Sequence, residues 1–255
     1  MQPYYDDGTC TIYHGEASAL LAEMSEASVD AVVTDPPYSS GGMFRSDRSG
    51  DPAVKYRGWS HNGDGSRRAP TAEYGSFAGD NRDQWAWLRW VTAWSWQTLR
   101  VTRPGGHSFM FTDWRQLPAA TDASQFGGWT WRGIVVWDKG IARPIRGKFR
   151  NHLEYVIWST NGPATEAGGY PSALISVPTV GPEDRQHVTE KPAQLLRALL
   201  QVVGPGSLTI LDPFMGSGTT LRAAKDLGHR AIGIEIEERY CEIAARRLGQ
   251  EVLAL

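Results

Sequence analysis

The chain has few cysteines, no long apolar run and no excess of charge of one sign, and each absence excludes a class of protein. Its two cysteines, Cys10 and Cys241, have no cysteine or histidine neighbours at metal-ligand spacing, so we expect reduced thiols and no metal site. No segment approaches the roughly 20 apolar residues that a membrane span needs. The first residues, MQPYYDDGTC, lack a basic start and an apolar stretch, so we expect no secretory signal and a cytoplasmic location.

The charges are nearly balanced. Lysine and arginine number 26 and aspartate and glutamate 28, for a formal net charge of −2 at pH 7. This balance excludes a protein coated in basic surface, but a local basic patch can still bind nucleic acid. The 255 residues suffice for one large domain with a buried core. Because no internal repeat and no clean linker divide the chain, we predict a single domain over residues 1–255.

Strand-like and helix-like segments alternate along the chain, which predicts an α/β fold with a mostly parallel sheet. Residues 39–79, rich in glycine, serine and arginine and without periodicity, predict a mobile or functional loop. Three tryptophans at helical spacing, Trp87, Trp90 and Trp94, predict core packing rather than a platform for base stacking. Strands are predicted over 9–14, 29–34, 107–112, 130–137, 154–159, 208–211 and 231–234, and helices over 16–24, 83–100, 114–126, 192–203, 220–227 and 237–248.

A glycine turn, DPFMGSGTT at 212–220, separates a predicted strand from a predicted helix. Such turns let a ligand approach the backbone closely, because glycine has no Cβ. Glu235 ends the next predicted strand, where an acid accepts hydrogen bonds from ribose hydroxyls. No lysine follows Gly218 as in a phosphate-binding loop, and Leu221 stands where a dinucleotide site has its third glycine. An adenosyl ligand without a pyrophosphate fits this turn best; an ordinary structural turn is the alternative.

The sequence Asp-Pro-Pro-Tyr at 35–38 directly follows the predicted strand 29–34, and its two prolines end that strand. Exocyclic amines of adenine and cytosine are poor nucleophiles, because their lone pair is delocalised into the ring. The Asp35 carboxylate and the Pro36 carbonyl can accept the two N–H bonds of such an amine and favour a pyramidal nitrogen. Tyr38 offers a face for an extruded base. The alternative is an ordinary turn with a solvated aspartate.

Together these motifs resemble those of the β-class, or circularly permuted, DNA amino-methyltransferases. The resemblance rests on DPPY, on TEKP at 189–192 before a helix, and on DPFMGSGTT followed by GIEIEERY at 233–240, in the order of that family. It covers nearly the whole chain. It implies a Rossmann-like methyltransferase fold, with a seven-stranded, doubly wound, mostly parallel sheet in which strand 208–211 lies beside strand 29–34. It also implies S-adenosylmethionine as cofactor, double-stranded DNA as partner and a flipped base as methyl acceptor.

The resemblance further implies the residues of the site. The family often has Gly-Asp near the cofactor adenine, where this chain has Gly15-Glu16. Glu235 would bind the ribose and Lys191 would lie near the methionine carboxylate. The target base would be held by Asp35, Pro36, Pro37 and Tyr38, and the cofactor also by Glu16 and by the turn residues Asp212, Pro213, Phe214, Gly216, Ser217, Gly218 and Thr219.

Transfer from sulfonium to nitrogen is direct, so positioning can supply most of the acceleration and no covalent enzyme intermediate is needed. In agreement, the chain has no Pro-Cys pair, the nucleophile that carbon-5 methylation of cytosine requires. We predict methylation of adenine N6. Cytosine N4 is the nearest alternative, although the cytosine members of the family more often have serine in place of Asp35. RNA and protein-glutamine amino-methyltransferases fit less well, because they usually have the glycine motif before the proline motif. The alternative to an enzyme is a nucleic-acid-binding protein that has kept this fold and lost its activity.

Residues 139–150 (KGIARPIRGKFR) contain five basic residues and no acid, and they lie between two predicted strands. We predict that this segment is a target-recognition loop whose Arg143, Arg146, Lys148 and Arg150 contact phosphates; a solvated basic loop is the alternative. The chain leaves little room for a large recognition domain, so we expect a short or loosely defined target, or a second subunit in a homodimer. It resembles neither a nuclease nor a helicase, which indicates a free-standing enzyme, with or without a separate restriction partner.

Overall fold

The computed structural model describes residues 1–38, 82–140, 144, 146–179 and 191–250. The chain divides into two compact units, Met1–Pro36 with Leu88–Leu255, and Pro37–Trp87. The predicted loop 39–79 lies outside the described residues. In the smaller unit, Asp83 accepts hydrogen bonds from the backbone N–H groups of the first turn of helix α4 (Gln84–Val101). The indole N–H of Trp87 donates to the Pro37 carbonyl at 2.7 Å.

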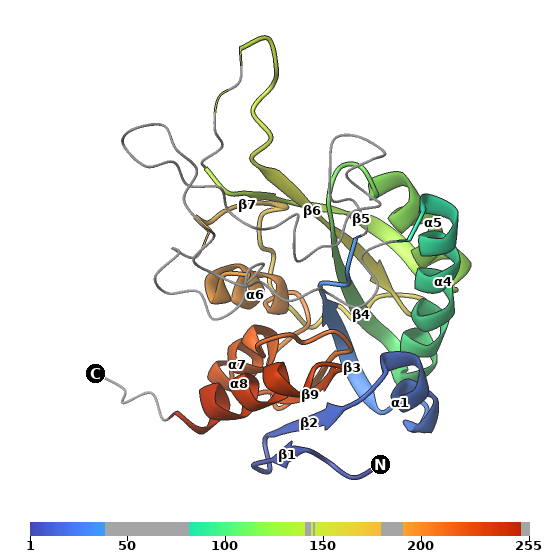
Figure 1. Cartoon of the computed structure of the whole chain (residues 1–255), viewed down its shortest axis with the longest axis vertical. Helices are drawn as coiled ribbons and strands as arrows, with labels where there is room; N and C mark the ends of the chain where they lie inside the picture. Colours follow the sequence, from blue (N-terminus) through green and yellow to red (C-terminus); the bar gives the residue numbers. More distant parts are fainter. Residues whose placement is uncertain (39–81, 141–143, 145, 180–190, 251–255) are drawn as a thin grey trace, which may run out of the picture. The chain divides into compact units, whose positions relative to one another are not determined.

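The larger unit is built on a sheet of nine strands among the described residues, in the order β1-β2-β9-β8-β3-β4-β6-β5-β7 (Figure 1). Strands β2, β9, β8, β3 and β4 run parallel to one another, and β6 is antiparallel to both β4 and β5. The strands are β1 (Tyr5–Asp6), β2 (Cys10–His14), β3 (Val29–Thr34), β4 (Thr102–Thr112), β5 (Thr130–Asp138), β6 (Leu153–Thr160), β7 (Leu174–Ser176), β8 (Thr209–Asp212) and β9 (Arg230–Glu235).

The predicted α/β fold is confirmed, but the described residues form a sheet of nine strands instead of seven. The two additional strands are the edge strands: β1 pairs antiparallel with β2, and β7 pairs parallel with β5. They contain two and three residues, which is too few for an alternation of apolar and polar residues to appear in the sequence. The seven strands between these edges are the ones that the sequence predicts.

Helices cover both faces of the sheet. Figure 1 shows α1, α4 and α5 on one face and α6, α7 and α8 on the other. Helix α6 illustrates why: its four buried residues are all leucines, which form one apolar stripe along the helix. Besides α4, the helices are α1 (Ala17–Glu23), α5 (Leu117–Phe126), α6 (Ala193–Leu200), α7 (Thr219–Asp226) and α8 (Glu238–Gly249).

The centre of the sheet is the core of the larger unit. All six residues of β3 are buried, as expected for a central parallel strand with both faces covered. The one charged residue among them, Asp30, is paired with Arg103 at 2.7 Å and accepts a hydrogen bond from the Thr209 N–H. Trp94 is buried and Trp90 half-buried, so the prediction that these tryptophans pack in the core is confirmed.

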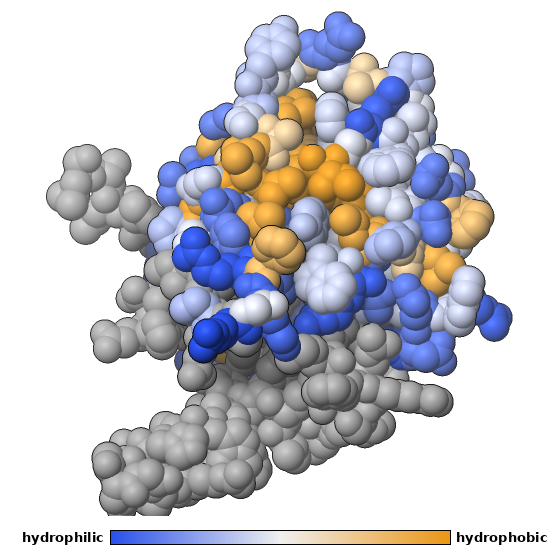
Figure 2. Space-filling view, turned by 90° about the horizontal axis from the view of Figure 1, so that it is seen from above, coloured by the Kyte–Doolittle hydropathy of each residue, from blue (hydrophilic) through white to orange (hydrophobic). Residues whose placement is uncertain are grey.

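The surface seen in Figure 2 has a hydrophobic area surrounded by hydrophilic side chains. Large aromatic side chains are also exposed on several elements, among them Trp96 on α4 and Trp131 on β5. Within the described part of the chain, no helix combines the length and the apolar character needed to cross a membrane. The described residues also contain no group of three or more histidine, cysteine or acidic side chains able to hold a metal ion.

Candidate active site

The candidate site lies where the parallel strands β8, β3 and β4 end. Val32 of β3 is level with Leu211 of β8, and Thr34 of β3 is level with Met110 of β4. Since the carboxyl ends of neighbouring parallel strands meet at one edge of a sheet, Asp212 and Asp35 come to the same place, although they are far apart in the sequence. Folds of this type bind their ligands at this edge, outside the carboxyl ends of the strands.

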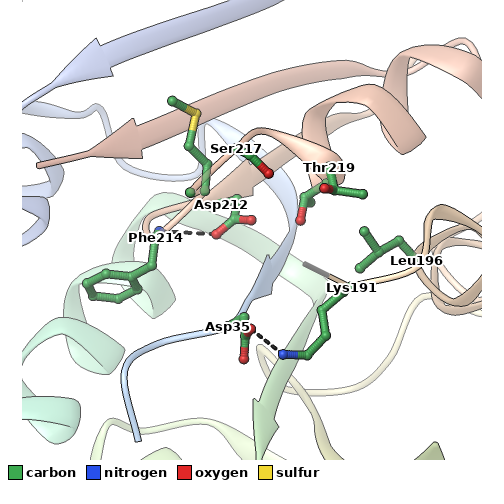
Figure 3. A pocket seen from close by; sticks show the side chains of 10 residues that line it. Asp35, Lys191, Leu196, Asp212, Phe214, Ser217 and Thr219 are labelled. Carbon is green, nitrogen blue, oxygen red and sulfur yellow. Dashed lines mark hydrogen bonds and ion pairs between the residues drawn. The ribbon is translucent and has the colours of Figure 1, made fainter. Parts of the chain in front are cut away.

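A pocket opens at this edge (Figure 3). Its empty space, including the part open to solvent, is about 400 Å³. Seven of the residues predicted for the site contribute to it, and both the DPPY turn and the glycine turn are represented. The lining residues are Asp35, Lys191, Leu196, Asp212, Phe214, Met215, Gly216, Ser217, Thr219 and Thr220.

Asp35 and Lys191 form an ion pair within the pocket (Figure 3). Lys191 lies just before α6, and only 8% of its side chain is exposed. Burial alone lowers the pKa of Lys191, but the carboxylates of Asp35 and Glu154 outweigh burial, so the pKa is raised and the ammonium stays charged. The sequence predicted a role for each of these two residues, and the structure brings them into direct contact.

Asp212 is the second acid of the pocket and is almost completely buried, with 3% of its surface exposed. Its Oδ1 accepts a hydrogen bond from the Phe214 N–H at 3.1 Å. Burial raises the pKa of Asp212 to about 7; hydrogen bonds from Thr220 and Phe214 only partly offset this effect, and the nearby charge of Asp35 adds to it. The carboxyl therefore titrates near neutral pH and is ready to ionise beside a positive charge.

The glycine turn after β8 is held by Glu235. One Glu235 oxygen accepts from the Gly216 N–H at 3.0 Å and the other from the Glu237 N–H at 2.8 Å. Burial raises the pKa of Glu235, and these backbone donors lower it in part. Gly218 adopts a φ of 78°, and a Cβ there would lie 2.7 Å from the Cβ of Ala244. Gly218 thus allows α7 to pack against α8, whereas Gly216 lines the pocket.

Phe214 connects the pocket to helix α4. Its ring centre lies 5.3 Å from that of Trp90 and 5.1 Å from that of Trp94, at tilted and edge-to-face angles that aromatic pairs favour. The tryptophan stripe, which the sequence indicated only as core, therefore also supports a side chain of the pocket. Two tryptophan rings of α4 thus set the position of the Phe214 ring.

Several predicted residues lie outside the pocket lining. Glu16 caps helix α1 by accepting a hydrogen bond from the Ala19 N–H at 2.8 Å. It follows the end of β2, where His14 is level with Glu235, so Glu16 and Glu235 share one edge of the sheet. The other predicted residues that do not line the pocket are Pro36, Pro213, Gly218 and Glu235 in the larger unit and Pro37 and Tyr38 in the smaller one.

Four residues at or beside the site were not predicted. Leu196, Met215 and Thr220 line the pocket, and Glu154 lies 3.6 Å from the Lys191 ammonium. Met215 and Thr220 lie within the motif that the sequence analysis singled out. Glu154 also left a signal, because it is the one charged residue in the predicted strand 154–159. The sequence did not show that this strand is antiparallel and so begins at the edge where its neighbours end.

The predicted target-recognition loop connects β5 to β6. Figure 1 shows the described part of this segment, including residues 146–150, extending away from the sheet. Arg146, Lys148 and Arg150 are exposed, whereas Arg143 lies outside the described residues. Phe149 between them is fully exposed. The loop thus presents basic side chains to solvent.

Known proteins resemble this chain in sequence and in fold. The family model of the N6/N4 DNA methylases matches residues 29–179 and 176–246. The Type II methyltransferase M.ScaI of Streptomyces caespitosus is 23% identical, over 100% of this chain and 86% of its own. The solved M1.HpyAVI–SAM complex has a TM-score of 0.66 and 23% identity, covering 94% of this chain and 100% of that one. The cytosine-N4-specific PvuII DNA methyltransferase has a TM-score of 0.71 and 16% identity, covering 99% and 91%. With most of its length matched by the family model, the chain belongs to the N6/N4 DNA methylases.

Proposed function

We propose that the protein transfers a methyl group from S-adenosylmethionine to the N6 amino group of a flipped adenine in double-stranded DNA. The observation that carries the proposal is the presence of Asp35, from the DPPY turn, in one pocket with Asp212, Phe214 and Lys191. An acceptor for an amine and groups suited to a charged adenosyl cofactor thus share one edge of the sheet. Membership of the N6/N4 DNA methylase family supports an exocyclic amine as the acceptor.

The residues of the pocket fit S-adenosylmethionine, which has a sulfonium, an ammonium and a carboxylate group. Buried Lys191 would hold the carboxylate, and buried Asp212 would face the ammonium. Phe214 offers an aromatic ring to the adenine, and Glu235 would accept hydrogen bonds from the ribose. When bound, the cofactor supplies an activated methyl group. The related fold of M1.HpyAVI, solved in complex with SAM, supports this assignment.

Asp35 would orient the target nitrogen. Its carboxylate and the Pro36 carbonyl would accept the two N–H bonds of the amine, so that the nitrogen lone pair points at the methyl group. The nitrogen loses one proton as it gains the methyl group, and Asp35 is the adjacent base. Tyr38 would stack on the extruded base, a contact worth about 1–3 kcal/mol. An aspartate at the first position of the motif supports adenine over cytosine.

DNA would contact the basic loop of residues 139–150. Its exposed Arg146, Lys148 and Arg150 would bind phosphates, together with Arg143. Such contacts fix the register of the protein on the duplex without reading its sequence. The loop begins at Lys139, directly after β5, and so starts at the sheet edge that contains the pocket.

Cytosine N4 is the second candidate for the methylated atom. The similarity in fold to the cytosine-N4-specific PvuII DNA methyltransferase, with a TM-score of 0.71, favours keeping it. Both reactions use the same amine chemistry, so the shape of the base pocket decides between them. Asp35 and Lys191 would have the same roles in either case.

Nucleoside mass spectrometry tests the proposal directly. DNA from cells that express the chain should contain N6-methyladenine, and DNA from cells that express Asp35→Ala should not. Purified protein should transfer tritiated methyl groups to unmethylated duplex DNA. N4-methylcytosine instead of N6-methyladenine would reject adenine as the target, and no methylated base with folded wild-type protein would favour the inactive binder.

A further inference from the structure

Four charged side chains of alternating sign meet at the edge of the sheet: Asp35, Lys191, Glu154 and Lys139. They come from separate parts of the chain. Asp35 follows β3 and Lys139 follows β5, while Lys191 precedes α6. Glu154 lies near the beginning of β6, which is level with the end of β4 because these two strands are antiparallel. The direction of β6 is therefore what brings Glu154 to the active-site edge.

Lys191 is shared between two carboxylates. It forms an ion pair with Asp35, and its Nζ lies 3.6 Å from Oε2 of Glu154. The same Nζ lies 5.1 Å from the centre of the Phe111 ring, which is a cation–π distance. The other Glu154 oxygen, Oε1, accepts a hydrogen bond from Lys139 at 3.0 Å. Burial raises the pKa of Glu154, but Lys191 and Lys139 outweigh it, so the pKa is lowered and the carboxylate stays charged.

We propose that Glu154 is a positioning residue for methyl transfer, which acts by holding the Lys191 ammonium while Asp35 binds the target amine. This inference rests on the role of Asp35 in the proposed function. A carboxylate has two oxygens and about four acceptor sites. With Oδ2 of Asp35 directed at Lys191, the acceptor sites of Oδ1 point elsewhere, so the ion pair orients the carboxylate for an amine.

Two physical arguments make Glu154 necessary to this arrangement. A buried ammonium is costly unless counter-charges balance it, and a hydrogen bond from the amine draws part of the Asp35 counter-charge away from Lys191. Glu154 supplies that charge within 4 Å. Without it, Lys191 would attract the Asp35 carboxylate more strongly, and the stronger pair would compete with the hydrogen bond from the amine. Lys139 in turn holds Glu154 by a hydrogen bond to its other oxygen, Oε1.

The test compares Glu154→Gln with a matched control. Glutamine keeps the size of the side chain and an acceptor for Lys139, but it removes the charge. We expect kcat to fall about 10- to 100-fold, the loss that follows when reacting groups are misplaced by about 1 Å. The KM for S-adenosylmethionine and the Kd for DNA should change less than threefold. Asp138→Asn, at the end of the neighbouring strand β5, is the control and should leave kcat within twofold.

A double-mutant cycle tests whether Glu154 acts through Lys191. Lys191→Met should itself slow methyl transfer, and adding Glu154→Gln should cause no further loss, because the partner of Glu154 is then gone. Losses that multiply would overturn the proposal, as would a kcat of Glu154→Gln equal to that of Asp138→Asn. If Glu154→Gln does not fold, Glu154→Asp replaces it: a shorter carboxylate should lower kcat at unchanged KM, and a wild-type kcat would overturn the proposal.

These results can be separated from a failure of the proposed function. If the wild type methylates cytosine, adenine is wrong as the target, but the coupling of Glu154 to Lys191 is still measured on that base. If folded Asp35→Ala keeps full activity, the role of Asp35 is wrong, and the inference about Glu154 fails with it. If Asp35→Ala is inactive and the cycle is multiplicative, the inference about Glu154 alone is rejected.

Discussion

Replacing Asp212 by asparagine should stabilise the cofactor-free protein above neutral pH. Asp212 is 3% exposed, and its pKa is raised to about 7 by burial. Asparagine has the same shape, and its amide oxygen can keep the hydrogen bond that the Phe214 N–H makes at 3.1 Å. The substitution therefore removes the cost of burying a charge and leaves the packing of the pocket nearly unchanged.

The magnitude follows from the pKa. In the unfolded chain Asp212 titrates near 3.8, so between pH 3.8 and about 7 unfolding releases a proton. The contribution of this group to stability is complete below pH 3.8 and is lost as the pH rises to about 7. The whole loss is about 4 kcal/mol, because one pKa unit corresponds to about 1.4 kcal/mol. About 2 kcal/mol of it falls between pH 5.5 and pH 8.5.

Urea unfolding of wild type and Asp212→Asn at pH 5.5, 7 and 8.5, without cofactor, measures this difference. The advantage of the variant in unfolding free energy should grow by about 2 kcal/mol across the range. Asp122→Asn, on the exposed side of α5, controls for loss of a carboxylate as such. A difference that stays constant, or that favours the wild type as the pH rises, would refute the reasoning. The variant should also bind S-adenosylmethionine more weakly, as calorimetry would show.

The remaining predictions concern the other groups of the site. Asp35→Ala should abolish tritiated methyl transfer, and Asp35→Asn should leave slight activity at best, with folding checked by circular dichroism. Full activity in folded Asp35→Ala would contradict the mechanism. Glu235→Ala should weaken S-adenosylmethionine binding about 10- to 100-fold by calorimetry, because hydrogen bonds to a charged group contribute about 1.5–3 kcal/mol; wild-type affinity would remove Glu235 from the site. Neutralising Arg143, Arg146 and Lys148 together should raise the Kd for DNA and leave cofactor binding intact. The salt dependence of the Kd should flatten by up to about one unit of log–log slope per lost phosphate contact. An unchanged slope would show that the loop does not contact DNA phosphates.

The sequence by itself determined the fold class and the two acidic turns of the site. Alternating strand and helix patterns require a parallel sheet, because helices must cover both of its apolar faces. Asp35 and Asp212 each follow a buried strand. In a parallel sheet such positions lie at one edge, so their meeting in one pocket is a consequence of local patterns. The Trp90 and Trp94 spacing likewise indicated burial, which depends on helical periodicity alone.

Tertiary structure decided which side chains touch. Gly218 looked like a position where a ligand approaches the backbone, but a Cβ there would meet Ala244 of α8, a contact that only the packing of two helices creates. The pairing of Lys191 with Asp35 and Glu154 depends on the order of the strands and on β6 running antiparallel. Residue periodicity says which face of an element is buried, but not which element covers it. The direction of β6 carries no local signature, and it places Glu154 beside the site.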